Sequence, residues 1–283
     1  DPLTVRRPIG LPVSVGCVNY LIIVSINIHK SNRYREPYWS ANGKRIYLLR
    51  FSGVPDGGRL SIWEEGKRMR TCWRWRFIES IGGFLPEAPD RLAVVIIDAQ
   101  RIALIDVNRC REIKQYYTAS EDEPVWLGGA SLSPDGTQLA YYRRGKLSLT
   151  AFSTTPASLA LEYTIEVIDL ATGEIQELAW GANPSWSPDG KQIAYVSVDG
   201  IYLMNPDGTR QRKVKELDFY EDSIEDLFAP TPRWSPDGKW LVYDREDAMA
   251  SEGRRIYIFN LDTGEEVRLE TVDEGYEPFW RSK

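Results

Sequence analysis

The chain has 283 residues, of which 42% are hydrophobic and 27% charged, a composition typical of globular rather than disordered proteins. It carries 35 Lys and Arg against 41 Asp and Glu, and the net charge of −6 argues against a general nucleic-acid-binding protein, which needs a basic face. The single histidine, His29, excludes His-rich metal sites and argues against most nucleophile–histidine catalysis.

The first predicted element is an uncharged segment, residues 9–28, which follows Arg6 and Arg7. Its length and basic flank are those of a membrane anchor. Pro12 and Gly16 interrupt it, however, and Val and Ile dominate over Leu and Ala, which favours β-strands. Two interpretations stay open: strands over 11–18 and 20–28, or an anchor over 9–28 followed by a domain over 36–283.

From residue 36 onward the sequence repeats itself. Two copies share the run Trp-Ser-Pro-Asp-Gly-Lys, within 183–195 and 231–243. Weaker copies follow the same pattern at 36–47, 84–94, 130–141 and 277–283. The aligned landmark positions, spaced by 46 to 54 residues, are Trp39, Leu85, Leu132, Trp186, Trp234 and Trp280. This period is that of a four-stranded propeller blade.

Each repeat reads as an apolar strand, a tight Pro-Asp-Gly turn, two more strands and a charged outer strand that resists edge-to-edge pairing. In the turn, Asp bonds to nearby groups and Gly supplies a positive φ. Because the aspartates recur at one position, we interpret them as turn residues and not as metal ligands. The predicted structural turns contain Asp135, Gly136, Asp189, Gly190, Asp237 and Gly238. The Arg- and Trp-rich stretch 68–76 is interpreted as a protected outer strand in preference to a nucleic-acid contact.

These motifs resemble the WD-like propeller repeats of the TolB family, most specifically over 186–202 and 234–257. The resemblance covers the propeller part of that family only. It implies an all-β fold, a six-bladed β-propeller of four-stranded antiparallel blades, whose last blade is closed by the C-terminal strand together with N-terminal strands. The implied blades cover 38–83, 84–125, 126–182, 183–230, 231–276, and 277–283 plus 1–37.

The order of strands fixes two faces of such a propeller. Turns between strands one and two, and between strands three and four, share one face, here called the turn face. Loops between strands two and three, and between successive blades, share the opposite face, here called the loop face. The irregular insertions 143–163, 217–230 and 244–253 all belong to the loop face, where we expect partner recognition.

Acidic loops near blades five and six form the binding hypothesis, with solvated surface charge as the alternative. The predicted residues are Asp218, Phe219, Tyr220, Glu221, Asp222, Glu225, Asp226, Asp273, Glu274 and Glu277. Concentrated negative charge favours a basic peptide or protein segment over nucleic acid, and the aromatic residues would supply apolar anchors.

The remaining chemistry is sparse. Cys17, Cys72 and Cys110 permit one disulfide at most, and buried free thiols are the favoured interpretation. We expect no catalytic residues, metal or cofactor, because no phosphate loop, HExxH or Gly-x-Ser-x-Gly pattern occurs. The resemblance implies a non-enzymatic protein-interaction platform, located outside the cytoplasm in the cell envelope. The alternatives are a membrane-anchored propeller subunit of a larger complex, a carboxylate glycosidase, or an accessory propeller domain of a peptidase.

Overall fold

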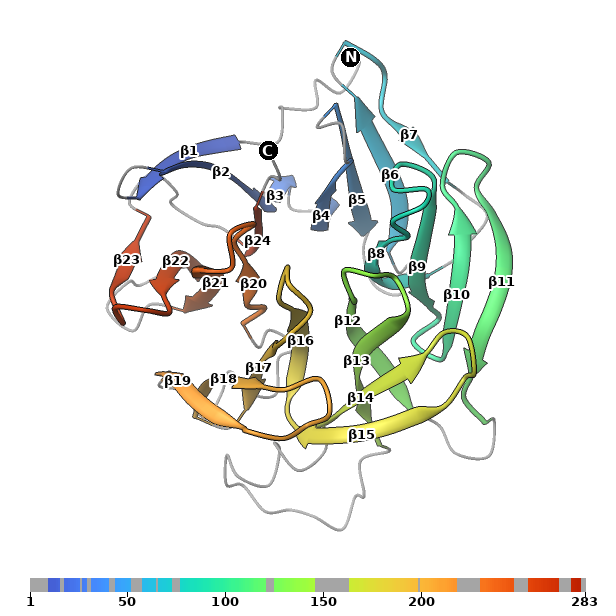
Figure 1. Ribbon diagram of the computed structural model, residues 1–283. Helices are drawn as coiled ribbons and strands as arrows, with labels where there is room; N and C mark the ends of the chain where they lie inside the picture. The colour runs from blue at the N-terminus through green and yellow to red at the C-terminus, as the bar shows by residue number, and fades with distance from the viewer. Residues whose placement is uncertain are drawn as a thin grey trace.

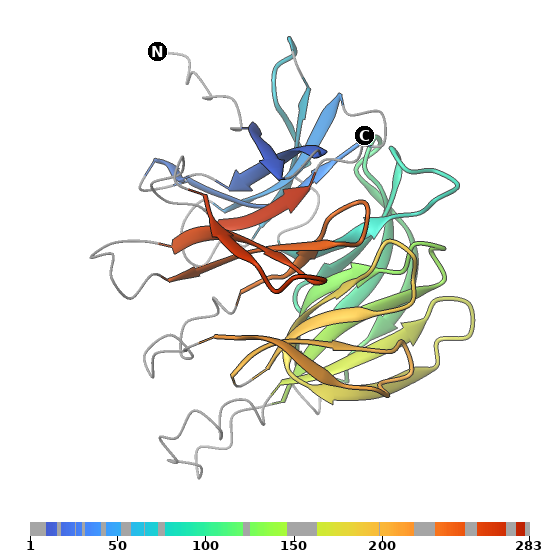
Figure 2. The same ribbon diagram turned by 60° about the vertical axis from the view of Figure 1, so that its left-hand side comes forward.

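The computed structural model describes residues 10–15, 18–25, 27–29, 32–40, 44–51, 58–64, 66–72, 77–120, 125–145, 163–197, 199–217, 230–246, 254–269 and 276–280. The regular elements in these ranges are β-strands, which form antiparallel sheets around a common centre (Figure 1). The described turns between the first and second strands of a blade, and between the third and fourth, gather on one side of the ring, at the right of Figure 2. The protein is therefore an all-β propeller.

Five sheets have the four or more strands of a complete blade. Blade one contains β3 (Asn27–His29), β4 (Asn32–Trp39), β5 (Arg45–Phe51), β6 (Arg59–Glu64) and β7 (Arg70–Thr71). Blade two contains β8 (Ile78–Phe84), β9 (Leu92–Ile97), β10 (Arg101–Asp106) and β11 (Arg111–Thr118). Blade three contains β12 (Trp126–Leu132), β13 (Gln138–Arg144), β14 (Tyr163–Asp169) and β15 (Ile175–Trp180). Blade four contains β16 (Ala182–Trp186), β17 (Ile193–Ser197), β18 (Gly200–Met204) and β19 (Arg212–Glu216), and blade five contains β20 (Arg233–Trp234), β21 (Trp240–Glu246), β22 (Arg254–Asn260) and β23 (Glu266–Arg268).

The remaining sheet has three strands, β1 (Gly10–Val15), β2 (Val18–Ser25) and β24 (Tyr276–Trp280). The prediction of six four-stranded blades is therefore wrong, because the described strands form five such blades and this smaller sheet. The reason lies in β3, whose Asn27 pairs with Arg33 and whose His29 pairs with Asn32. The third N-terminal strand thus belongs to blade one and not to the sheet of β1, β2 and β24.

The described residues of the segment 9–28 form strands. β1 and β2 make a hairpin that reverses between Val15 and Val18, so the strand limits differ from the expected 11–18 and 20–28. β2 also pairs with β24, where Ile22 lies opposite Trp280. The N-terminal and C-terminal strands therefore meet in one sheet. Within the described ranges, no helix has the length and apolar character needed to span a membrane.

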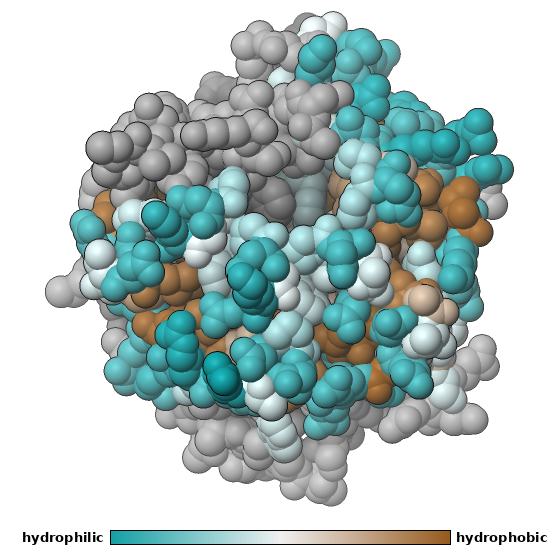
Figure 3. All heavy atoms as spheres, in the orientation of Figure 1, coloured by the Kyte–Doolittle hydropathy of each residue, from teal (hydrophilic) through white to brown (hydrophobic). Residues whose placement is uncertain are grey.

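The hydrophobic core lies between neighbouring sheets, with separate clusters between blades one and two, two and three, three and four, and four and five. Each cluster contains a buried tyrosine from the second strand of a repeat: Tyr47, Tyr141, Tyr195 or Tyr243. Their hydroxyl groups donate to internal acceptors, as from Tyr141 to Glu166 at 2.6 Å. By contrast, the face seen in Figure 3 is mostly hydrophilic, with apolar patches between polar side chains.

The predicted Pro-Asp-Gly turns are confirmed in blades three to five. Gly136, Gly190 and Gly238 have φ values of 75°, 70° and 71°. In each turn the aspartate accepts a hydrogen bond from the preceding serine hydroxyl, at 2.6 Å for Asp135, 2.7 Å for Asp189 and 2.6 Å for Asp237. This local bonding accounts for the recurrence of the aspartates.

The expectation of free thiols is wrong for two of the three cysteines. Cys72 and Cys110 form a disulfide, with their Cα atoms 5.5 Å apart. Cys72 follows β7 at the outer edge of blade one, while Cys110 lies in the turn between β10 and β11 of blade two. Adjacent packing of the blades brings together residues that are 38 positions apart in the sequence. Cys17 lies outside the described residues. The outer-strand interpretation of 68–76 is confirmed for Arg70–Thr71, which pairs with β6 at the sheet edge.

Candidate functional site

The acidic binding hypothesis falls mostly on residues that the structure does not describe. Residues 218–226, Asp273 and Glu274 lie outside the described ranges. Glu277 is described only as part of the backbone of β24. The acidic site therefore stays a prediction.

The described part of the loop face carries a different feature, at the end of blade three. Trp126 begins β12, Arg144 ends β13, Tyr163 begins β14 and Trp180 ends β15. The strand register sets Trp126 opposite Arg144, and Arg144 opposite Tyr163. Trp180 lies opposite Thr164, next to Tyr163 in sequence. The four residues Trp126, Arg144, Tyr163 and Trp180, here called the aromatic row, therefore follow one edge of the sheet from its inner to its outer strand.

Ring contacts connect the aromatic row to its surroundings. The Arg144 guanidinium lies 5.3 Å from the centre of the Tyr163 ring, a cation–π distance. Tyr142 meets the same ring edge-on at 5.4 Å between centroids. Phe77, which precedes β8 of blade two, meets Trp126 edge-on at 6.2 Å. These contacts hold Arg144 and Tyr163 within blade three and Trp126 against blade two.

Two members of the row are unusually exposed for their size. Trp126 is 40% exposed and Trp180 is 49% exposed, although both side chains are large and mostly apolar. Indole rings provide an extensive apolar surface together with one N–H donor, which is why tryptophan is common at the centre of protein interfaces. By the strand register, Trp126, Arg144 and Tyr163 share one face of the sheet, whereas Trp180, opposite Thr164, belongs to the other face. Each exposed indole can therefore bind a ligand through apolar and stacking contacts.

A buried polar contact lies directly behind the row. The Tyr141 hydroxyl donates to Glu166 at 2.6 Å, and Arg143 donates to the other carboxylate oxygen at 3.3 Å. Burial, together with the negative charge of Glu166, raises the pKa of Tyr141, so its hydroxyl stays protonated and keeps donating. This contact ties β13 to β14 and fixes the strands that carry Arg144 and Tyr163.

Sequence reasoning did not identify the aromatic row. One signal was available at Trp180, since the fourth strands of blades two, four and five end in the polar residues Thr118, Glu216 and Arg268. A tryptophan at that position departs from the repeat. Trp126 carried no comparable signal, because its exposure depends on how blades two and three pack. Across the described ranges, no group of three or more His, Cys, Asp or Glu side chains is placed to hold a metal ion.

No protein-family model and no curated protein matches the chain. Among solved structures, TolB from Acinetobacter baumannii is 16% identical with a TM-score of 0.62, over 93% of this chain and 62% of that one. A putative TolB from Agrobacterium tumefaciens is 17% identical with a TM-score of 0.59, over 87% of this chain and 88% of that one. An oligogalacturonate lyase in complex with manganese is 17% identical with a TM-score of 0.57, over 93% and 72%. The chain thus has the β-propeller fold of the TolB structures, as its repeats implied.

Proposed function

We propose that this protein is a non-enzymatic binding propeller that holds a peptide segment of a protein partner on its loop face. The observation that carries the proposal is the exposure of two tryptophans, Trp126 and Trp180, at the loop-face end of blade three, where Arg144 and Tyr163 also lie. Apolar side chains of a peptide would pack on the rings, and the guanidinium would bond to its carbonyl groups. TolB-like structures share the fold, which is compatible with such a role.

The proposed location is outside the cytoplasm. The disulfide between Cys72 and Cys110 supports it, since such bonds form and persist in oxidising compartments and are rare in the cytosol. The order of strands in the sequence predicts that the acidic loops belong to the loop face as well. If they adjoin the bound segment, a basic flank on the peptide would strengthen binding at low salt.

A peptide-display selection on the immobilised protein tests the proposed function. Selected peptides are expected to bind the intact protein, and Trp126→Ala is expected to weaken that binding about tenfold or more, the loss of about 1.4 kcal/mol or more that truncating an interface tryptophan causes. Ile175→Ala is the matched control, because Ile175 is also exposed but begins β15 at the turn face, at the far end of the strand from Trp180. Equal affinity in the Trp126 variant, or no enriched peptide, would contradict the proposal. No turnover of oligogalacturonate is expected in a parallel assay.

A further inference from the structure

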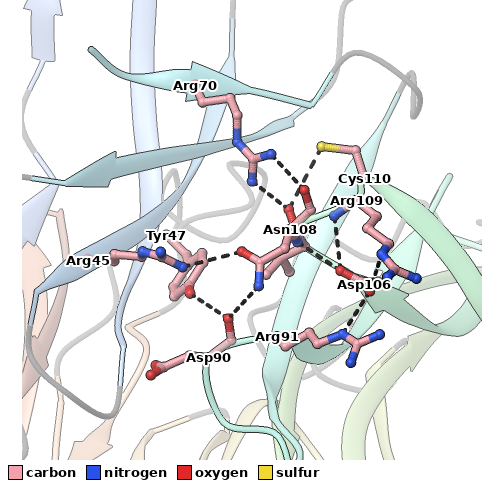
Figure 4. A network of polar contacts seen from close by, with 10 residues as sticks. Arg45, Tyr47, Arg70, Asp90, Arg91, Asp106, Asn108, Arg109 and Cys110 are labelled. Carbon is pink, nitrogen blue, oxygen red and sulfur yellow. Dashed lines mark hydrogen bonds and ion pairs between the residues drawn. The ribbon is translucent and has the colours of Figure 1, made fainter. Parts of the chain in front are cut away.

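The turn face carries an arginine pair at the junction of blades one and two. Asp106 ends β10 with its side chain fully buried, and its Oδ1 accepts the backbone N–H groups of Asn108 and Arg109, both at 3.0 Å. Its Oδ2 accepts the Nε of Arg91 at 2.9 Å and forms an ion pair with the Nε of Arg109 at 4.0 Å. One buried carboxylate therefore holds two guanidinium groups close together (Figure 4).

The two arginines are not needed to build this turn. In blade three, Asp169 accepts the N–H groups of Ala171 and Thr172 in the same way. In blade five, Asn260 accepts those of Asp262 and Thr263. Threonine thus stands where blade two has Arg109. The backbone carbonyl of Arg91 accepts the first N–H of the turn, from Val107. The residue that does the same is Thr137 in blade three and Lys239 in blade five.

The turn that carries Arg109 is held in place from blade one. The disulfide joins the next residue, Cys110, to Cys72. Arg70 donates to the carbonyl groups of Asn108 and Val107, at 2.7 and 2.9 Å. Arg45 reaches the Asn108 side chain at 3.3 Å. A ligand at Arg109 would therefore meet a backbone that is already ordered, so little entropy would be lost on binding.

The pair has donors left for a ligand. Each guanidinium meets Asp106 through its Nε, and among the residues that the structure describes no partner is seen for the two terminal amino groups of either arginine. The side chains of Arg91 and Arg109 are 50% and 62% exposed. Among the described residues of the surrounding cluster, cations outnumber carboxylates: Arg45, Lys67, Arg70, Arg91 and Arg109 accompany Glu64, Asp90 and Asp106. The two oxygen atoms of a carboxylate ligand would be used by one guanidinium group. A phosphate group has the charge and the oxygen atoms to bind both guanidinium groups.

We propose that Arg91 and Arg109 form a binding site for a phosphate group on the turn face, between blades one and two. The site is separate from the aromatic row, which lies on the opposite face. The phosphate could be free in solution or belong to a lipid headgroup, and the chemistry at the two arginines would be the same.

Calorimetric titration at low ionic strength tests the site, with inorganic phosphate as one probe and acetate as its carboxylate control. Vesicles of phosphatidic acid, compared with phosphatidylcholine, form a second arm that reveals a lipid source. We expect Arg91→Gln and Arg109→Gln each to weaken phosphate or phosphatidic acid binding about tenfold, the loss of one charge-assisted contact. Arg111→Gln, an exposed arginine at the start of β11, should change it by less than about twofold.

Arg91→Lys keeps the positive charge but removes the planar pair of N–H donors. It should restore only part of the phosphate affinity that Arg91→Gln loses, because an ammonium group cannot bond through two parallel N–H groups. Thermal unfolding of each variant checks that the fold is retained. The proposal is overturned if neither probe binds, if acetate binds as tightly as phosphate, or if the Gln variants bind phosphate and phosphatidic acid as tightly as the intact protein.

Discussion

At the residue scale, backbone conformation and side-chain burial separate positions that look alike in the sequence. Gly136 and Gly238 occupy the same turn of two repeats, and both have positive φ. A Cβ at Gly238 would meet no atom of the described residues within 4 Å, whereas a Cβ at Gly136 would lie 2.5 Å from Cδ of Pro86. The first position needs glycine only for its backbone, and the second needs it for space as well.

Replacing these glycines by alanine should therefore have unequal effects. Gly238→Ala is expected to lower the free energy of unfolding by about 1 kcal/mol, the cost of the left-handed conformation for a residue with a Cβ. Gly136→Ala should cost more, because Pro86 must also move. Urea denaturation of both variants measures the difference. Equal losses, or no loss in either variant, would show that this account of the turns is wrong.

The buried tyrosines predict a decline in stability at high pH. Burial raises the pKa of Tyr195 to about 12, whereas a tyrosine in the unfolded chain titrates near 10. The contribution of this group to stability is full below about pH 10 and is lost as the pH rises toward 12, since the unfolded state releases its proton first. Urea denaturation between pH 9 and 11 should show a shallower pH dependence in Tyr195→Phe than in the intact protein. An unchanged slope would contradict the assignment.

At the element scale, the sequence predicted local structure better than long-range pairing. Recurrence identified the turns at Asp189 and Asp237, because a Pro-Asp-Gly turn is determined by neighbouring residues. The sheet to which β3 belongs, and the disulfide from Cys72 to Cys110, depend on which strands become neighbours in space. The aromatic row likewise depends on a register that brings its four members to one edge. The repeat pattern alone could therefore not predict the number of blades or the binding surface.

Pairing between the N-terminal and C-terminal strands is predicted to stabilise the propeller. Deleting residues 1–25 removes β1 and β2 but leaves β3 in blade one, so β24 loses its pairing with Ile22 and Ile23. The thermal midpoint of unfolding should fall, because an unpaired strand exposes its backbone N–H and C=O groups to water. Deleting residues 1–9 alone is the control. If the longer deletion unfolds like the control, pairing of these strands does not stabilise the propeller.

At the scale of the whole molecule, the propeller separates two kinds of surface. The turn face is built from repeated short turns and carries the arginine pair, while the loop face carries the aromatic row. Blade three extends between them, with Ile175 and Trp180 at opposite ends of the same outer strand. Binding at one face should therefore leave hydrogen exchange at the other face largely unchanged.

Hydrogen–deuterium exchange of the intact protein, with and without a peptide from the display selection, tests directly whether the loop-face end of blade three is the binding surface. We predict that the peptide slows exchange in segments that contain residues 126–127, 142–145, 163–165 and 179–181. Exchange in the turns at 133–137 and 170–174 of the same blade should stay as it is without peptide. Slower exchange confined to the turn face, or to blades other than blade three, would contradict the account.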